Sequence, residues 1–71
     1  MVTAVVRVWH AEDGWGVLDC EETPGGCWAH SSVVQMDGYR ALAPGQQVRL
    51  DWEYAEQDGF RFRAVQILLT D

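Results

Sequence analysis

Gly14-Trp15-Gly16-Val17-Leu18 and, nine residues after it, Cys27-Trp28-Ala29-His30 are the two segments that decide the fold. Side chains in both segments alternate in character, as they do on the two faces of a β-strand. One face carries the small and apolar residues Gly16, Leu18, Cys27 and Ala29. The other face carries Trp15, Val17, Trp28 and His30. The two segments therefore predict a hairpin that buries its small residues and turns its rings outward, with a loop at Thr23-Pro24-Gly25-Gly26.

Three further segments predict strands. Residues 2–9 read VTAVVRVW, which is rich in β-branched side chains and lacks Gly and Pro. Residues 48–54 alternate apolar and charged side chains, and residues 60–69 alternate until the phase slips near Ala64, which predicts a bulge. Turn signals stand at Glu12-Asp13-Gly14, Asp37-Gly38, Pro44-Gly45 and Asp58-Gly59. Five short strands, a long connection over residues 31–47 and no convincing helix predict an all-β fold, a small barrel.

The composition bounds the function. A chain of 71 residues predicts a single domain, 1–71, with room for one thin core. No nucleophile–base motif or metal-ligand spacing is present, so we expect a binding protein without a cofactor rather than an enzyme. Five Arg, no Lys and eleven acidic residues give a net charge of −6, which argues against a partner held mainly through its phosphates. We expect a cytoplasmic protein without a membrane partner, because no apolar run could cross a bilayer and the first residues do not resemble a secretory signal.

Cys20 and Cys27 are too few for a disulfide framework. The sequence favours two small hydrophobic side chains, which is how free cysteines usually behave. The gap between the cysteines is longer than the usual spacing of zinc ligands, so a metal site with a histidine is the weaker interpretation. A disulfide across the hairpin also stays open if the two lie opposite each other.

Rings turned toward solvent need an explanation. Trp15, Trp28 and His30 would form a flat π-surface on adjacent strands, and nucleobases stack on such surfaces for about 1–3 kcal/mol each. The alternative is that the indoles only cap the core, since tryptophan is often largely but not fully buried.

A family resemblance favours the first interpretation. Gly14-Trp15-Gly16-Val17-Leu18 and Cys27-Trp28-Ala29-His30 resemble the paired motifs K-G-F-G-F-I and V-F-V-H-F of bacterial cold-shock proteins. The likeness continues at Val6-Arg7, at Asp37-Gly38-Tyr39-Arg40-Ala41-Leu42 and at Gly45-Gln46-Gln47-Val48. It implies a five-stranded antiparallel oligonucleotide-binding (OB-fold) barrel that binds single-stranded RNA or DNA, as an RNA chaperone or transcription antiterminator. Members of this family are often acidic, so the net charge agrees with the resemblance.

The resemblance also assigns the stacking positions. They fall on Val8, Trp15, Val17, Trp28, His30, Ser31 and Tyr39. Val8 stands where the family has tryptophan, Val17 and Ser31 where it has phenylalanine, and Asp13 where it has lysine. Because each lost ring removes a stacking contact, we expect affinity near micromolar or weaker, about −8 kcal/mol. The larger indoles of Trp15 and Trp28 offset part of this loss.

Four further residues keep two interpretations each. Trp9 either packs at the barrel edge, which we favour, or reaches the stacking surface through a bulge. Arg7 stands at the family's lysine and either contacts phosphate or bases, or is a solvated cation. Arg61 and Arg63 share one face of the last strand, where they either meet phosphates or pair with surface carboxylates.

The leading hypothesis is thus a cytosolic monomer that binds single-stranded nucleic acid. The alternative is a degenerate barrel that serves as a protein-interaction or self-associating module, possible as a dimer. It follows from the lost rings, the absence of Lys and an aromatic surface that could meet a hydrophobic partner.

Overall fold

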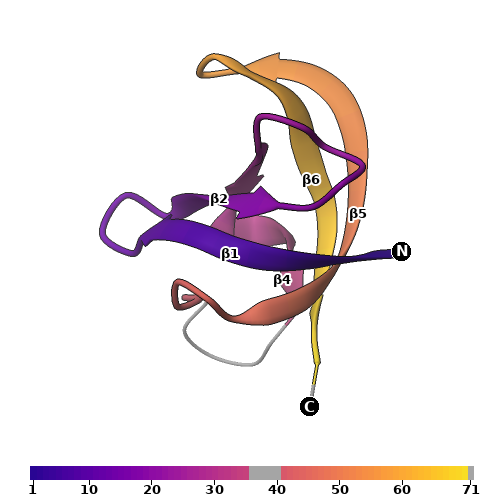
Figure 1. Cartoon of the computed structure of the whole chain (residues 1–71). Coiled ribbons are helices and arrows are strands. Elements are labelled where there is room, and N and C mark those ends of the chain that lie inside the picture. The colour runs from indigo at the N-terminus through magenta and orange to yellow at the C-terminus, as the bar shows by residue number, and fades with distance from the viewer. Residues whose placement is uncertain (36–40, 71) are drawn as a thin grey trace.

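The fold is an all-β barrel, as expected. A computed structural model describes residues 1–35 and 41–70. The elements in chain order are β1 (Val2–His10), β2 (Trp15–Asp19), β3 (Cys27–His30), the short 3-10 helix η1 (Ser31–Val33), β4 (Val34–Gln35), β5 (Gln47–Gln57) and β6 (Phe60–Leu69). Figure 1 shows β1 crossing in front of the long β5–β6 hairpin, whose tip rises above β1 and β2.

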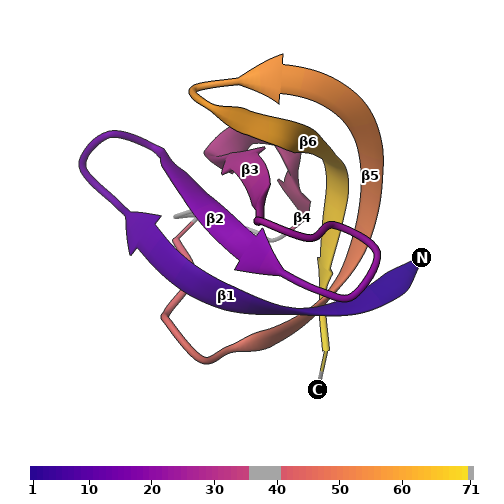
Figure 2. The ribbon, with the colours of Figure 1, turned by 45° about the horizontal axis from the view of Figure 1, so that its top comes forward.

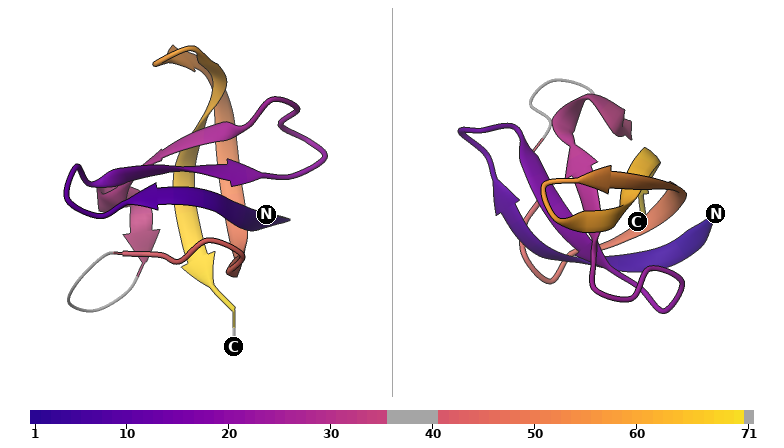
Figure 3. Two further views of the ribbon diagram at one scale, coloured as in Figure 1. Left: turned by 60° about the vertical axis from the view of Figure 1, so that its left-hand side comes forward. Right: turned by 90° about the horizontal axis from the view of Figure 1, so that it is seen from above.

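Hydrogen-bonded neighbours follow the order β3-β2-β1-β5-β6-β4, and an additional β3–β6 pairing closes five strands into a ring. The β1–β2, β2–β3, β1–β5 and β5–β6 pairs are antiparallel. The closing β3–β6 pair is parallel, which differs from the expected all-antiparallel barrel. Figure 2 and the view from above in Figure 3 show the β5–β6 hairpin bending over β3 to make this closure. Closure leaves no free edge on β3 or β6 at this point.

The core fills the ring with side chains from every strand. Leu18, Cys27, Ala29, Val48, Leu50 and Ile67 are fully buried. Leu18, Cys27 and Ala29 are inward residues of the two motif segments, so the predicted core face of this hairpin is confirmed. Trp15, Trp28 and His30 lie outside the core cluster.

Turns and bulges follow the sequence closely. Asp58 and Gly59 have φ values of 50° and 86°, and they join Gln57 to Phe60 in a two-residue turn. Left-handed backbone at both positions is what the Asp-Gly pair favours. On β6 the register moves from Asp51↔Gln66 to Trp52↔Ala64, so the predicted bulge beside Ala64 is confirmed.

The connection over residues 31–47 contains two short elements that the sequence did not predict. Helix η1 covers three residues, and β4 is a two-residue strand that pairs in parallel with β6 through Val34↔Ile67 and Gln35↔Leu68. Two residues are too few to produce a detectable period, so this strand is set by the buried Val34 and its partner strand. The predicted Asp37-Gly38 turn lies outside the described residues.

No helix in the described part of the chain is long and apolar enough to cross a membrane.

Candidate nucleic-acid interface

Cross-strand pairing places four rings together on the outer face of β1, β2 and β3. His10 pairs with Trp15, and Trp15 pairs in turn with His30. Trp28 pairs with Val17 and so lies one step along the same face. We call His10, Trp15, Trp28 and His30 the aromatic strip. The two histidines are exposed and the two indoles are partly buried.

The rings of the strip are close and share similar tilts. The His10 and Trp15 ring centroids are 4.4 Å apart, those of Trp15 and Trp28 are 6.2 Å apart, and those of Trp28 and His30 are 6.1 Å apart. The Trp15 and Trp28 planes differ by only 21°. The His10–Trp15 and Trp28–His30 planes are tilted by 44° and 36°, so the two near-parallel indoles are the part of the strip that best suits the stacking of flat ligands.

Trp28 holds its polar edge away from solvent. Its Nε1–H group is buried and has no hydrogen-bond partner among the described protein atoms. Trp9, on the core side, has an Nε1–H group that is buried without a partner in the same way, and each such donor costs about 1–3 kcal/mol. The donor of Trp28 is therefore covered, while part of its ring stays exposed.

Local hydrogen bonds fix the His30 ring. Its Nδ1 accepts from the Ser32 backbone N–H at 3.1 Å and lies 2.9 Å from the Ser32 hydroxyl oxygen. His30 is thereby the N-cap of η1. Because Nδ1 accepts the backbone hydrogen bond, the neutral imidazole carries its proton on Nε2.

Backbone contacts join the two ends of the hairpin at this side of the strip. The Ser31 N–H donates to the Gly14 carbonyl at 2.8 Å, and the Gly14 N–H donates to the His10 carbonyl at 2.8 Å. Gly14 has φ 77°, a conformation that side chains rarely adopt. A Cβ at Gly14 would also lie 3.3 Å from the Ser31 hydroxyl oxygen, so Ser31 is packed against the turn.

Two expected stacking positions contribute little exposed surface. Val17 is only 2% exposed, so a base has no surface there on which to lie. Its Cγ1, the Arg7 guanidinium and the Phe60 ring surround Gly26, where an added Cβ would meet each of them at 2.9 to 3.1 Å. Val8 pairs with Val17 and is partly buried. The short side chain of Val17 does not extend beyond these neighbours. The position therefore has almost no exposed surface, although the family has a phenylalanine there.

Trp9 packs against the core side and not in the strip. It lies over Gly16, where an added Cβ would approach the indole to 2.2 Å, and it contacts the core cluster. The sequence left two positions open for Trp9, and in the structure it packs at the barrel edge and does not reach the strip. Gly16 is needed at this point because only a residue without a side chain leaves room for the indole.

Arg7 is held by a carboxylate of its own chain. Its Nε donates to Asp19 Oδ2 at 2.9 Å and its Nη2 donates to Asp19 Oδ1 at 2.5 Å. A third, longer contact of 3.3 Å joins Nη2 to the Gly25 carbonyl. The hydrogen bond and the charge of Asp19 raise the pKa of Arg7 above its ordinary value. Arg7 occupies a bulge, since the β1–β2 register shifts between Val6 and Val8.

Arg63 is paired in the same way, and Arg61 is not. Arg63 Nε donates to Glu53 Oε2 at 3.0 Å, and its Nη2 contacts the same oxygen. Arg63 neighbours Trp28 in the β3–β6 register, so this ion pair borders the strip. Arg61 is exposed and forms no ion pair with another described residue. The expected pairing with a surface carboxylate therefore holds for Arg63 and not for Arg61.

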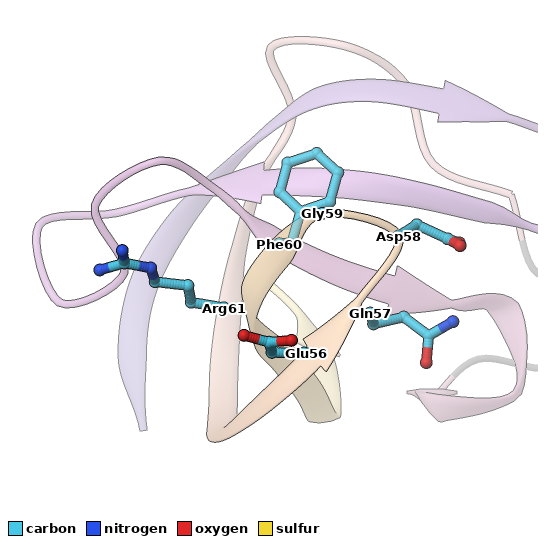
Figure 4. A pocket seen from close by; sticks show the side chains of 6 residues that line it. All are labelled: Glu56, Gln57, Asp58, Gly59, Phe60 and Arg61. Atoms are coloured by element: carbon cyan, nitrogen blue, oxygen red, sulfur yellow. The ribbon is translucent and has the colours of Figure 1, made fainter.

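The tip of the β5–β6 hairpin carries Arg61 beside a shallow cavity of about 360 Å³, which is lined by Glu56, Gln57, Asp58, Gly59, Phe60 and Arg61. Figure 4 shows the Phe60 ring and the Arg61 guanidinium pointing to different sides of the tip, with Gln57 and Asp58 turned away from both. Phe60 is the ring that reaches Gly26 next to Val17. The hairpin tip thus adjoins the end of the face that holds the strip.

His10 is the strip residue that sequence reasoning missed. Its ring is the nearest neighbour of Trp15 in the strip. The pairing of His10 with Trp15 across a tight turn is the signal that could have found it. Tyr39, the remaining predicted stacking residue, lies outside the described residues.

Both cysteines are free thiols. Cys27 is fully buried in the core, as predicted, and Cys20 is half-buried with its Sγ 3.1 Å from the Thr23 hydroxyl oxygen. Burial, and to a lesser extent the charge of Cys20, raises the pKa of Cys27 to about 12. Within residues 1–35 and 41–70, no group of three or more His, Cys, Asp or Glu side chains could hold a metal ion.

The chain is similar to curated cold shock-like proteins. It is 44% identical to cold shock-like protein CspD of Vibrio cholerae over 48 residues, which are 68% of this chain and 63% of that protein. It is 40% identical to cold shock-like protein CspD of Escherichia coli over 52 residues, which are 72% of this chain and 69% of that protein. The chain belongs to the cold-shock protein family.

A more distant relative extends the similarity over nearly the full chain of this cold-shock protein. Cold shock-like protein CspD of Haemophilus influenzae is 29% identical over 70 residues, which cover 99% of this chain and 97% of that protein. No protein-family model matches the chain. The family membership that the motifs indicated is therefore confirmed by relatives and by the barrel, and the lost rings mark the chain as a divergent member.

Proposed function

We propose that this cold-shock protein binds single-stranded RNA or DNA by stacking bases on the aromatic strip. The observation that carries the proposal is the row His10, Trp15, Trp28 and His30, whose neighbouring centroids lie 4.4 to 6.2 Å apart on the outer face of three strands. Stacking needs only a π-face from each base, so the strip tolerates many sequences. A sequence-tolerant, weak binder suits the role of an RNA chaperone or antiterminator.

Charge supports stacking as the main source of affinity. Arg7 and Arg63 border the strip but are paired with Asp19 and Glu53, and the chain contains no Lys. Cations that already hold a carboxylate offer little to a phosphate, so few counterions are released on binding. We expect affinity near micromolar, about −8 kcal/mol, with a shallow dependence on salt.

Fluorescence and labelled-ligand titrations test this function. A short pyrimidine-rich oligonucleotide, offered as RNA and as DNA of one sequence, is expected to quench tryptophan emission of the wild-type protein. Trp28→Ala is expected to weaken binding, followed by anisotropy of a labelled oligonucleotide, by about 1–3 kcal/mol. Tyr54→Ala is the matched control, because Tyr54 is 79% exposed but belongs to another ring cluster.

The outcome that rules the function out is unchanged fluorescence and anisotropy at high micromolar oligonucleotide. Equal weakening by Trp28→Ala and Tyr54→Ala would place the binding surface elsewhere. Circular dichroism of both variants checks that each remains folded.

A second candidate function is a protein-interaction or self-associating module. The observation in its favour is Tyr54, a large ring that is 79% exposed in a protein whose border arginines are neutralised. Sedimentation separates the two: a dimer that oligonucleotide does not dissociate, and that Tyr54→Ala does, supports the module. A monomer at all concentrations supports the single-strand binder.

A further inference from the structure

Two arginines on the strip's border are each engaged by a carboxylate. The two carboxylate oxygens of Asp19 accept hydrogen bonds from Nε and Nη2 of Arg7, at 2.9 and 2.5 Å. A guanidinium group binds phosphate in the same bidentate geometry. One carboxylate oxygen of Glu53 accepts hydrogen bonds from both Nε and Nη2 of Arg63. All four side chains are between 43% and 47% exposed, so a ligand in solution can reach them.

The two pairs lie beside Trp28 of the strip. Arg63 neighbours Trp28 across the β3–β6 pair. Arg7 converges with Val17 on Gly26, and Val17 is the cross-strand partner of Trp28. Trp28 therefore has one paired arginine on each side, on β6 and on β1.

We propose that Asp19 and Glu53 are built-in competitors of the phosphates of a bound single strand, and so set the affinity and the salt dependence of this protein. The inference rests on the proposed function of the strip. Asp19 occupies the Nε–Nη2 edge of the Arg7 guanidinium, so a phosphate that binds this edge must displace the carboxylate. The displaced carboxylate then stays beside the phosphate and repels it. Exposed ion pairs are weak enough to be exchanged, which makes this competition graded rather than absolute.

The competition selects ligands by their bases. With both guanidinium groups occupied, a strand gains from stacking on the rings but gains little from its charge. Double-stranded nucleic acid, which hides its base faces and offers mainly phosphates, is disfavoured. Asp19 and Glu53 thus act as specificity-determining residues for unpaired bases, without touching a base themselves.

Asp19→Asn tests the inference most directly. Freeing Arg7 is expected to tighten oligonucleotide binding about fivefold, the factor that about 1 kcal/mol of ion-pair energy converts to. The slope of log K against log salt is expected to steepen by about 0.7, the value for one additional phosphate contact to a single strand. Glu53→Gln is expected to act in the same direction through Arg63.

Two controls distinguish the release of a paired arginine from the effect of a change in net charge. Glu21→Gln changes the charge by the same amount, but Glu21 is exposed in the β2–β3 loop and forms no ion pair with another described residue. It is expected to leave the salt slope unchanged. In an Arg7→Gln background, Asp19→Asn is expected to lose its effect on affinity and slope, because no guanidinium remains to be freed.

The results distinguish failure of the inference from failure of the function. If the wild-type protein binds and Asp19→Asn matches Glu21→Gln in affinity and in salt slope, the carboxylates are not competitors. If neither the wild-type protein nor Asp19→Asn binds oligonucleotide, the strip itself is not a base-binding surface. Thermal unfolding of each variant confirms that the affinities compare folded proteins.

Discussion

Two clusters of rings in this protein have similar composition and different geometry. The aromatic strip on β1, β2 and β3 has tilted or near-parallel planes and lies outside the core cluster. The hairpin cluster of Trp52, Tyr54 and Phe62 on β5 and β6 has Trp52 at 86° to Tyr54 and at 88° to Phe62, with Tyr54 at 43° to Phe62. Phe62 is only 6% exposed, and Trp52 packs against the core.

The difference separates two uses of an aromatic side chain. Edge-to-face contacts pack Trp52 against Tyr54 and Phe62; Phe62 is buried and Trp52 partly buried, whereas Tyr54 is 79% exposed. In the strip the two histidines are exposed, the two indoles are partly exposed, and the Nε1–H of Trp28 is buried. Under the proposed function, the strip is the surface for ligands, and Trp52 and Phe62 of the hairpin cluster are packing.

Phe62→Ala is the largest test of this contrast. Removing a buried phenylalanine is expected to lower the free energy of unfolding by about 3–5 kcal/mol, measured by urea denaturation, because a cavity remains beside Trp52 and Cys27. Phe62→Leu conserves more volume and is expected to cost less than about 1.5 kcal/mol. The leucine variant stays folded and is expected to bind oligonucleotide as the wild-type protein does. A large loss of affinity in folded Phe62→Leu would contradict the division between packing and binding.

Local patterns predicted the face that each ring of the β2–β3 hairpin takes. Alternation over two short segments placed Trp28 and His30 outward and Cys27 and Ala29 inward, and the structure agrees. Alternation is a local property, because the period of a strand depends only on the backbone. The same reasoning located the Asp58-Gly59 turn and the bulge at Ala64.

Contacts between distant residues could not be predicted in this way. Arg7 and Asp19 are twelve residues apart, and Arg63 and Glu53 are ten apart, so their pairing depends on strand register. Val17 was expected to face solvent, and it does lie outside the core cluster, yet Arg7 and Phe60 converge beside it. The parallel closure by β3 and β6 likewise follows from the tertiary fold alone.

The inward face of β3, which carries Cys27, provides the second test, the pH dependence of stability. Cys27 points inward, and burial raises its pKa to about 12 from an ordinary value of 9.0. The folded state thus holds the thiol proton more tightly than the unfolded chain does. Its contribution to stability is complete below pH 9 and is lost as the pH rises toward 12. We expect the free energy of unfolding to fall by about 1.4 kcal/mol at pH 10 relative to pH 8, measured by urea titration.

Cys27→Ala is the control for this pH dependence. The variant starts from a lower stability, because a buried side chain is shortened, but the fall between pH 8 and pH 10 is expected to shrink. Cys20 is retained in both proteins, so the two proteins differ only at Cys27. An equal fall in both proteins would show that the buried thiol does not control alkaline stability.

The test with the smallest expected effect asks whether the β5–β6 hairpin also takes part in binding. Arg61 is exposed at the hairpin tip, two residues before Arg63 on the same face of β6, and forms no ion pair with another described residue. It is the described arginine on this face that a phosphate can use without displacing a carboxylate. Arg61→Gln is expected to weaken oligonucleotide binding roughly two- to threefold and to flatten the salt slope by about 0.7.

Arg49→Gln decides what such a result means. Arg49 is also exposed and also forms no ion pair with another described residue, but it pairs with Thr3 and Leu68 in the barrel wall away from β3. Both substitutions change the net charge equally. If Arg61→Gln alone flattens the salt slope, the β5–β6 hairpin has two parts. The part around Phe62 packs against the barrel, and the tip extends the binding surface of the strip. If both variants weaken binding alike, only net charge acts, and the binding surface ends at Trp28.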